Sequence, residues 1–541
     1  MQSKALLQIR RLLSSCGVVS LRATISSVLE CPSGIELVVS DGVSSVSLPA
    51  HVSNAFKAER GRNGYNIDLS AWGYSPFAAD AKLSVTAVLQ YPEQTEHISQ
   101  SSGEGSGSFD LKTQQSSSGL VLKMKKAGKL LWAGEIGFLW RAAQITAMQW
   151  LSQAKRIKLN YRKNHPNIVQ NNRRHELFID HGFGGGTNAY SVHYFREKRQ
   201  TNRQQPFALV FDPWKLEFRV TCSYEFHDKI LWFKEMDVLC KWISKQTFAT
   251  VTINSIYGYP SPALLLDCVR RYKESLPGAQ MSIMTHDYYS VCPSPHLIND
   301  QGWFCGIPSD KECDRCFSKN KLINVSPSHI SSVHEWRSLW RTTYEAADTI
   351  RVFSESSLRI LSKGHPQIAH GKFEVVPHQV PRLSAVPTPS AQKIHIGVMG
   401  HLNTHKGARQ VHDLMQHVED ARGNIAISLF GSIYPPCEYH YATVHHHYDV
   451  RNLPRLIRNA GVNVFFFPSI CPETYSFVVD EMIYLGLPIV CFDIGAPADR
   501  IRNYAAGSVI PIGNGRDILK AIEGLFEKTY KSSDVMHLNA I

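Results

Sequence analysis

The sequence predicts an α/β protein in which two parallel-sheet domains face a cleft, preceded by a small β-rich domain and a basic helical segment. From about residue 174, strand-like apolar runs alternate with helical stretches almost to the end of the chain, a pattern typical of parallel sheets covered by helices. Three prolines between Pro381 and Pro389 divide this alternation into two blocks. A region of different texture precedes both blocks, with short strands, then a Ser/Gly-rich stretch, then clustered positive charge.

Residues 1–97 have the pattern of β-structure. Short apolar or alternating runs, such as Gly34–Ser40 and Ala81–Leu89, are separated by glycine, serine, aspartate and proline, which favour turns. We expect a small β-sandwich-like domain here. Residues 98–119 are rich in serine and glycine, the composition of a flexible linker.

Positive charge is concentrated in residues 120–173. The chain of 541 residues has a formal net charge of +12, and residues 120–175 hold twelve lysines and arginines against one acid, Glu135. Apolar residues recur there at a spacing of three to four, which predicts an amphipathic helix. Such local charge indicates an anionic surface rather than a nucleic acid that the protein coats. Two interpretations stay open: the segment binds an anionic membrane surface, or its aromatic side chains pack on the neighbouring domain.

The two α/β blocks, 174–385 and 386–541, each have the length of one Rossmann-like domain. The first block begins with the strand-like run Glu176–Asp180, and the second begins with Lys393–Gly400. Ligands of such sheets bind beyond the carboxyl ends of the strands. We therefore expect the functional residues in the loops that follow the strands.

Two glutamates eight positions apart mark the second domain. Glu473 lies in the loop after the run Val462–Phe467, and Glu481 lies on the helix that follows. A loop carboxylate can reach a hydroxylated ligand. The helix N-terminus near Tyr475 offers free N–H groups and the positive end of a dipole to a phosphate. The alternative is a pair of surface acids beside an ordinary helix.

Two other loops carry groups that suit a diphosphate. Lys406 follows a strand, with His401 five residues before it, and a flexible ammonium suits a phosphate as a point charge. In the first block, a glycine-rich turn that includes Gly185 and Gly186 follows a strand and opens a helix. Clustered glycines let backbone N–H groups approach a diphosphate or a sugar, although a tight turn is the simpler explanation.

A histidine and an aspartate stand at the end of another strand of the first block. His286 and Asp287 follow the run Met281–Thr285 directly, so the rule for parallel sheets places them at the cleft. The alternative is a buried histidine that only stabilises the fold.

Four cysteines close together in the sequence form a candidate metal site. Their spacing is C-x12-C-x7-C-x2-C, and four thiolates suit tetrahedral zinc better than an iron–sulfur cluster. A closed shell of four thiolates would hold the long loop at 291–321 and would have no catalytic part. Free thiols or a labile disulfide are the alternatives. The four residues are Cys292, Cys305, Cys313 and Cys316.

These motifs resemble family 4 glycosyltransferases, retaining enzymes with the GT-B fold, of the bacterial cell-surface polysaccharide type. The resemblance covers roughly residues 174–530 and rests on the runs 472–488, 400–407 and 285–289. It implies that a nucleotide diphosphate sugar lies on the C-terminal domain. The nucleotide's ribose hydroxyls would be held by Glu481 and the sugar hydroxyls by Glu473.

The same resemblance assigns roles to the remaining site residues. Lys406, the helix N-terminus near Tyr475 and His401, which stands where the family usually has arginine, would stabilise the leaving diphosphate. His286 would face the donor sugar and Asp287 the acceptor. No catalytic metal is expected, because cationic side chains and the helix dipole take its place. The proline-rich stretch 381–389 would be the hinge on which the domains close.

The expected function is therefore transfer of a hexosyl or deoxyhexosyl group to a glycan or lipid-linked glycan acceptor, in surface polysaccharide (O-antigen-like) biosynthesis. A catalytically weak or inactive GT-B protein that binds glycans or acts as a scaffold is the alternative from another class. An epimerase or a phosphorylase is the alternative within the enzymes. We expect a cytoplasmic protein, because no signal peptide or membrane-spanning run is evident, with residues 120–173 as a candidate peripheral contact with the inner face of the membrane.

Overall fold

The computed structural model describes strands within residues 6–109 and most of residues 174–530. The gaps in the second range are 182–184, 201–203, 213–215, 223–229, 321, 324–329, 388–392, 421–424, 435–441 and 446–447. The predicted basic segment 120–173 lies outside the described residues, as does most of the predicted linker 98–119.

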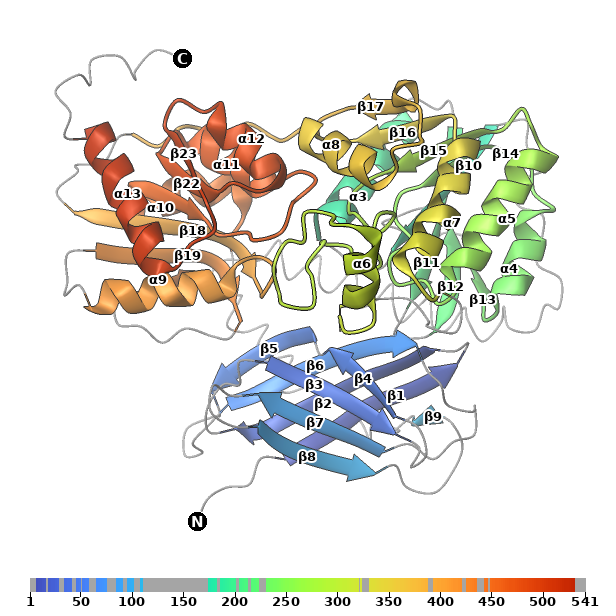
Figure 1. Ribbon diagram of the computed structural model, residues 1–541, viewed down its shortest axis with the longest axis horizontal. Helices are drawn as coiled ribbons and strands as arrows, with labels where there is room; N and C mark the ends of the chain where they lie inside the picture. Colours follow the sequence, from blue (N-terminus) through green and yellow to red (C-terminus); the bar gives the residue numbers. More distant parts are fainter. Residues whose placement is uncertain are drawn as a thin grey trace.

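The N-terminal region consists of two antiparallel sheets, drawn in blue in Figure 1. Their orders are β5-β6-β2-β1-β9 and β4-β3-β7-β8. Buried residues alternate with half-buried ones along β3, so its sheet has one apolar face, as a β-sandwich requires. Strands β8 and β9 continue the β-structure past residue 97, into residues expected to be linker, because β8 pairs with β7 and β9 with β1. The strands are β1 (Leu6–Ser15), β2 (Val18–Val28), β3 (Gly34–Ser40), β4 (Ser45–Pro49), β5 (His51–Lys57), β6 (Tyr65–Tyr74), β7 (Ser84–Gln90), β8 (Thr95–Ser101) and β9 (Ser108–Phe109).

The first α/β domain is built on a sheet of order β13-β12-β11-β10-β14-β15-β16-β17. Six neighbouring strands are parallel, and β12 and β13 add an antiparallel edge. The strands are β10 (Arg174–His181), β11 (Gln204–Asp212), β12 (Glu217–Thr221), β13 (Ile230–Phe233), β14 (Phe248–Ile253), β15 (Gln280–Met284), β16 (Thr349–Val352) and β17 (Phe373–Val375). The helices are α3 (Gly185–Gln200), α4 (Met236–Ile243), α5 (Pro262–Ser275), α6 (Asp310–Phe317), α7 (Val333–Ala346), α8 (Glu355–Gly364) and the short η1 (His370–Lys372).

The second α/β domain has an all-parallel sheet of order β20-β19-β18-β21-β22-β23. Its strands are β18 (Ile394–Leu402), β19 (Ile425–Ile433), β20 (Ala442–His445), β21 (Val464–Phe467), β22 (Ile489–Phe492) and β23 (Gly507–Ile510). Its helices are α9 (Ala408–Asp420), η2 (Val450–Asn452), α10 (Leu453–Ala460), α11 (Phe477–Leu485), α12 (Gly495–Arg502) and α13 (Gly515–Tyr530). The predicted fold class, an α/β protein with two Rossmann-like domains after a β-rich N-terminal region, is confirmed.

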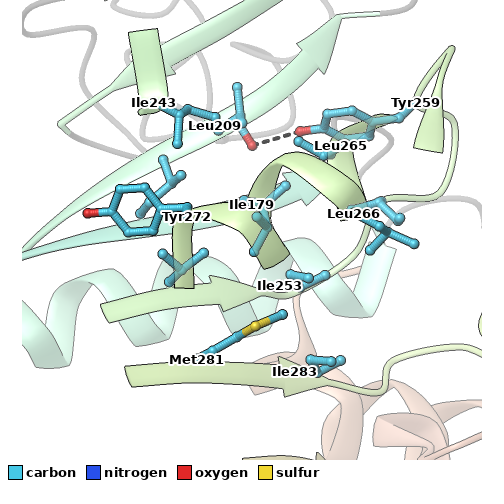
Figure 2. Packing of buried hydrophobic residues seen from close by; sticks show 14 of the residues in the cluster. Ile179, Leu209, Ile243, Ile253, Tyr259, Leu265, Leu266, Tyr272, Met281 and Ile283 are labelled. Carbon is cyan, nitrogen blue, oxygen red and sulfur yellow. Dashed lines mark hydrogen bonds between the residues drawn. The ribbon is translucent and has the colours of Figure 1, made fainter. Parts of the chain in front are cut away.

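Burial on both faces explains why these strands are apolar along their whole length. Figure 2 shows the first domain's core, where Ile179, Ile253 and Ile283 of three adjacent strands pack with residues of α4 and α5. Tyr259 closes this core and donates a hydrogen bond from its hydroxyl to Leu209 O at 3.0 Å. The packing fixes where each strand ends, and therefore where each following loop begins.

Each sheet reverses its strand order at one point, β10 beside β14 in the first and β18 beside β21 in the second. Ligands of doubly wound sheets bind at this switch point, beyond the carboxyl ends of the strands. Asp180 and Asn254 stand at the first switch point. His401 and the loop that carries Glu473 stand at the second.

Hydrogen bonds join the two α/β domains at the start of α8. The hydroxyl of Ser354, the N-cap of α8, lies 2.9 Å from Thr474 O, and Thr474 Oγ1 donates to His286 O at 3.0 Å. Helices α8 and α12 lie side by side (Figure 1) and are linked by an Arg359–Asp499 ion pair of 2.5 Å. None of the described helices is long and apolar enough to span a lipid bilayer.

Candidate active site between the two α/β domains

Three loops of the second domain converge on Glu473. The ammonium of Lys406, after β18, lies 2.7 Å from Glu473 Oε1, in the loop after β21. The Glu473 side chain is 8% exposed. Within the described part of the chain, Oε1 accepts no well-directed hydrogen bond, so the contact with Lys406 is an ion pair. Burial lowers the pKa of Lys406 and the Glu473 carboxylate raises it, with a net upward shift, so Lys406 is charged at pH 7.

Two glycines allow these loops to meet. Gly407 has φ +81°, and a Cβ there would lie 1.9 Å from Pro468 O. Gly495, which begins α12, has φ +67°, and a Cβ there would lie 2.7 Å from Pro472 Cα. Only glycine accepts both the left-handed backbone and the close approach. The loops after β18, β21 and β22 therefore form one surface around Glu473.

Glu481 lies on α11 and is buried. Burial, and after it the neighbouring Asp480, raises the pKa of Glu481 from 4.5 to about 7. Asp480 is neutralised differently, because it contacts the guanidinium of Arg500 and the hydroxyl of Tyr475. The two adjacent acids thus have different environments. Asp480 is held by Arg500 and Tyr475, whereas Glu481 has a carboxyl group that changes charge near neutral pH.

Tyr475 joins the domains as well as preceding α11. Its hydroxyl lies 3.1 Å from His378 O of the first domain and also contacts Asp480. Burial and the Asp480 carboxylate raise the pKa of Tyr475, so the hydroxyl stays protonated and can donate.

His401 is the last residue but one of β18, and its surroundings differ from those of Lys406. Its ring is exposed, and Nδ1 lies 2.8 Å from Ser432 Oγ on β19. Gly185 and Gly186 begin α3, while residues 182–184 of the predicted glycine-rich turn lie outside the described residues. A Cβ on Gly186 would lie 3.3 Å from the ring of Phe477, so the start of α3 packs against the start of α11.

His286 lies in an aromatic cluster that crosses the domain boundary. Its ring stacks on Phe353 with centroids 4.5 Å apart, and His378 stacks on the same ring at 3.9 Å. Tyr190 lies 4.8 Å from His286, and Phe477 of the second domain lies 5.1 Å from His378. Burial, then His378 and His181, lower the pKa of His286 well below 6.5, so its ring is neutral at pH 7.

Asp287 is held by its own loop and its neighbours. Its Oδ1 accepts a hydrogen bond from Tyr289 N at 2.8 Å, and Ser255 Oγ lies 3.4 Å from its Oδ2. Burial raises the pKa of Asp287. The residue lines a small cavity inside the first domain, with Trp340 and Tyr344. The predicted position of Asp287 beside an acceptor stays a prediction.

Sequence reasoning missed three residues of this site: Asn254, Phe353 and His378. Each follows or ends a first-domain strand, namely β14, β16 and β17. The rule that ligands bind beyond carboxyl ends would have selected these positions. Of the three residues, His378 had the clearest signal in the sequence, because it is a histidine that closely follows the strand β17.

The four cysteines line one cavity of about 470 Å³ in the first domain, together with Arg315, Lys319 and Arg337. Burial raises the pKa of Cys292 to about 12 and also raises the pKa of Cys305 and Cys313. Arg337 approaches Cys313 Sγ at 3.5 Å. Across the described ranges, no three His, Cys, Asp or Glu side chains are arranged as metal ligands. The structure therefore brings the thiols to one cavity, and the zinc site stays a prediction.

Comparison with known proteins defines the class of the second domain. Residues 381–540 match the family described as "Glycosyl transferases group 1", and this range contains Lys406, Glu473 and Glu481. No curated protein matches the chain. The second α/β domain is therefore similar to group 1 glycosyltransferase domains.

Solved structures with a similar fold are distant in sequence. The lipopolysaccharide outer core galactosyltransferase WaaB, in its apo form, has 11% identity and a TM-score of 0.42, covering 66% of this chain and 90% of that chain. Anabaena Alr3699/HepE, in complex with UDP and glucose, has 12% identity and a TM-score of 0.41, covering 67% and 92%. A glycosyltransferase from Rickettsia africae has 12% identity and a TM-score of 0.41, covering 66% and 89%.

Proposed function

We propose that the protein is a retaining glycosyltransferase that moves a hexosyl or deoxyhexosyl group from a nucleotide diphosphate sugar to a glycan or lipid-linked glycan. One observation carries the proposal: a buried carboxylate and a charged ammonium, Glu473 and Lys406, lie 2.7 Å apart at the switch point of the group 1 domain. Such a pair offers an acceptor to sugar hydroxyls and a cation to a diphosphate within one small site.

The second domain holds the donor in this proposal. The nucleotide's ribose hydroxyls bind Glu481 on α11, and the sugar hydroxyls bind Glu473. The diphosphate lies against Lys406 and the N-terminus of α11, beside Tyr475. The hydroxyl of Ser476, the N-cap residue, caps no N–H group of α11, so these groups are available to a phosphate. His401 assists Lys406 in this proposal.

Transfer takes place on one face of the sugar. The bond from the anomeric carbon to the phosphate oxygen breaks, and a bond to the acceptor oxygen forms on the same face. The acceptor's hydroxyl proton passes to the leaving phosphate. Lys406 and the helix dipole stabilise the charge that develops on the diphosphate, which is electrostatic catalysis, and the reaction needs no catalytic metal.

A lipid-linked acceptor would bring the enzyme to a membrane. Residues 120–173 are the candidate contact, because their lysines, arginines and tryptophans suit an anionic lipid surface. The protein would then act at the inner face of the membrane, in surface polysaccharide (O-antigen-like) biosynthesis. Deletion of 120–171 should then lower binding to anionic liposomes, whereas unchanged binding would favour packing of this segment on the protein.

A catalytically weak or inactive glycan-binding or scaffold protein is the second candidate. It is favoured by His401, which replaces the arginine usual in the resembling family and contacts Ser432. Replacement of Glu473 by alanine discriminates between the candidates. We expect transfer from the nucleotide sugar to fall by at least a hundredfold, while Glu523→Ala, an exposed glutamate on α13 of the same domain, keeps full activity. Unchanged turnover in Glu473→Ala would reject the mechanism.

The donor itself can be found without knowledge of the acceptor. A ligand that binds only the folded state stabilises it by mass action. A thermal-shift screen against nucleotides and nucleotide sugars should therefore give the largest shift with the true donor, and that shift should shrink in Lys406→Ala.

A further inference from the structure

The strand ends of the first domain hold a buried chain of hydrogen bonds that leads to His286. Asp180 is in β10, Asn254 follows β14 directly, and His286 lies two residues after the end of β15. These three strands are neighbours in the sheet, which is why Asn254 forms hydrogen bonds with residues 74 and 32 positions away in the sequence. Asp180 is 0% exposed and Asn254 is 1% exposed, so their polar atoms depend on one another for hydrogen bonds.

Asp180 fixes which way the amide of Asn254 faces. Its Oδ1 accepts from Asn254 Nδ2 at 2.9 Å and from His181 N at 2.8 Å, and its Oδ2 accepts from Ser191 Oγ at 2.6 Å. Three donors converge on one side chain, which is the environment of an accepting carboxylate. The amide nitrogen of Asn254 must therefore face Asp180. The backbone is held too, because Asn254 N donates to Ile179 O at 2.8 Å.

The amide oxygen is then left for His286. Asn254 Oδ1 lies 2.9 Å from His286 Nε2. An amide oxygen can only accept a hydrogen bond, so Nε2 must carry a proton. A neutral imidazole has one N–H, and Nδ1 is consequently the acceptor nitrogen. A half-turn of the ring about Cβ–Cγ would keep its stack on Phe353, whose centroid is 4.5 Å away, but it would put Cε1 in the place of Nε2 and break the hydrogen bond to Asn254.

We propose that Asn254, anchored by Asp180, is a positioning residue that keeps the proton of His286 on Nε2 and so presents Nδ1 as an acceptor. In the glycosyltransferase proposed above, on which this inference rests for its substrate, Nδ1 would receive a hydroxyl hydrogen of the donor sugar. It could not donate to a phosphate or a carboxylate. The substrate class is thus a sugar that carries a hydroxyl at this point, and a deoxy analogue lacking it would lose the bond.

The tautomer can be measured without any substrate. In ¹⁵N-histidine-labelled full-length protein, the His286 ring signals, assigned by comparison with His286→Gln, should show Nε2–H and bare Nδ1 at pH 7. The Nδ1–H form would overturn the inference. This measurement is independent of activity, so an Nε2–H tautomer in a protein that transfers no sugar would reject the proposed function alone.

Two substitutions test the role of Asn254. Asn254→Asp replaces the amide by a carboxylate, which favours the imidazolium. We expect kcat to fall roughly 10- to 100-fold, with KM little changed and with the acid limb of the pH profile moved to higher pH. The groups that also face His286 are His181, Tyr190 and His378, and none of them is altered. An unchanged pH profile in a folded Asn254→Asp protein would overturn the inference.

Asp180→Asn is the second variant, in case Asn254→Asp fails to fold. It releases the amide of Asn254 to turn, so a mixture of His286 tautomers is expected, and an unmixed Nε2–H form would overturn the anchoring role of Asp180. Asn463→Asp is the matched control. Asn463 is another buried asparagine, whose Oδ1 accepts from His395 N at 2.9 Å in the second domain. It should change stability and leave the His286 tautomer as it is.

Discussion

The two α/β domains share a strand order around their switch points but contribute different chemistry. The first domain contributes a neutral ring, His286, whose pKa is lowered by burial. The second contributes charge, through the Lys406–Glu473 ion pair and through Glu481, whose pKa is about 7. Under the proposed function, the second domain neutralises a charged ligand, and the first domain orients an uncharged part of it. Changes in the second domain should therefore depend on charge and pH, and changes in the first on geometry.

Loss of Lys406 should have the largest effect. Lys406→Ala removes the cation assigned to the diphosphate and leaves Glu473 buried without its partner. We expect kcat/KM to fall by roughly 10²- to 10³-fold, the usual cost of losing one group that stabilises transition-state charge. Steady-state kinetics with the donor found by thermal shift will measure it. Lys528→Ala, which removes an exposed lysine of α13, is the control. Equal turnover in the two variants would contradict the role of charge that we assign to the second domain.

The first domain differs from the second in its long loop at 291–321, whose four cysteines line one cavity. If zinc holds that loop, elemental analysis should find about one zinc per chain, and a chelator should lower the melting temperature, because metal binding adds to folding free energy. Cys313→Ser should lose the metal. Protein with only trace zinc and iron would contradict the prediction of a metal site.

Glu481 should make the second domain sensitive to pH. Folding raises the pKa of Glu481 from 4.5 to about 7, so the folded state binds this proton more tightly than the unfolded state. The free energy of unfolding therefore falls as pH rises from about 4.5 to 7, and the loss is complete above 7. Glu481→Gln has no such charge, and its melting temperature should exceed that of the native protein more at pH 8 than at pH 5.

The same substitution should weaken nucleotide binding. The ionised carboxylate accepts ribose hydroxyls best, so affinity should rise as pH rises through 7 in the native protein. At pH 8, Glu481→Gln should bind the nucleotide roughly tenfold more weakly, since a hydrogen bond to a charged group is lost. Titration calorimetry at two pH values checks both statements. A variant with the native affinity at pH 8 would show that Glu481 holds no ribose.

The smallest effect is expected where the domains touch through a glycine. A Cβ on Gly186 would lie 3.3 Å from Phe477, whereas a Cβ on Gly278 would meet no atom within 4 Å. Gly186→Ala should thus shift the start of α11 slightly and raise the donor's KM a few-fold, with little change in kcat. Gly278→Ala should leave both constants alone. Equal KM values in the two variants would mean that α3 does not support the donor site.

Much of this organisation could be predicted from local patterns. Alternating strand and helix signals gave the two sheets, because strands buried on both faces must be apolar throughout. Lys406, Glu473 and His286 were found because each follows a strand closely. The β-rich region was predicted too short, since β8 and β9 contain polar residues and are strands only through their partners β7 and β1.

The sequence by itself determined which residues stand at the carboxyl ends of the strands, since that depends on short-range periodicity. Only the tertiary structure decided which of them meet. Lys406 pairs with Glu473 because β18 and β21 are neighbours in the sheet, and Asn254 reaches His286 because β14 lies beside β15. His378 joins the aromatic cluster through β17 and its contacts with Phe353 and Tyr475. Strand order and domain contact are long-range properties, and no local pattern encodes them.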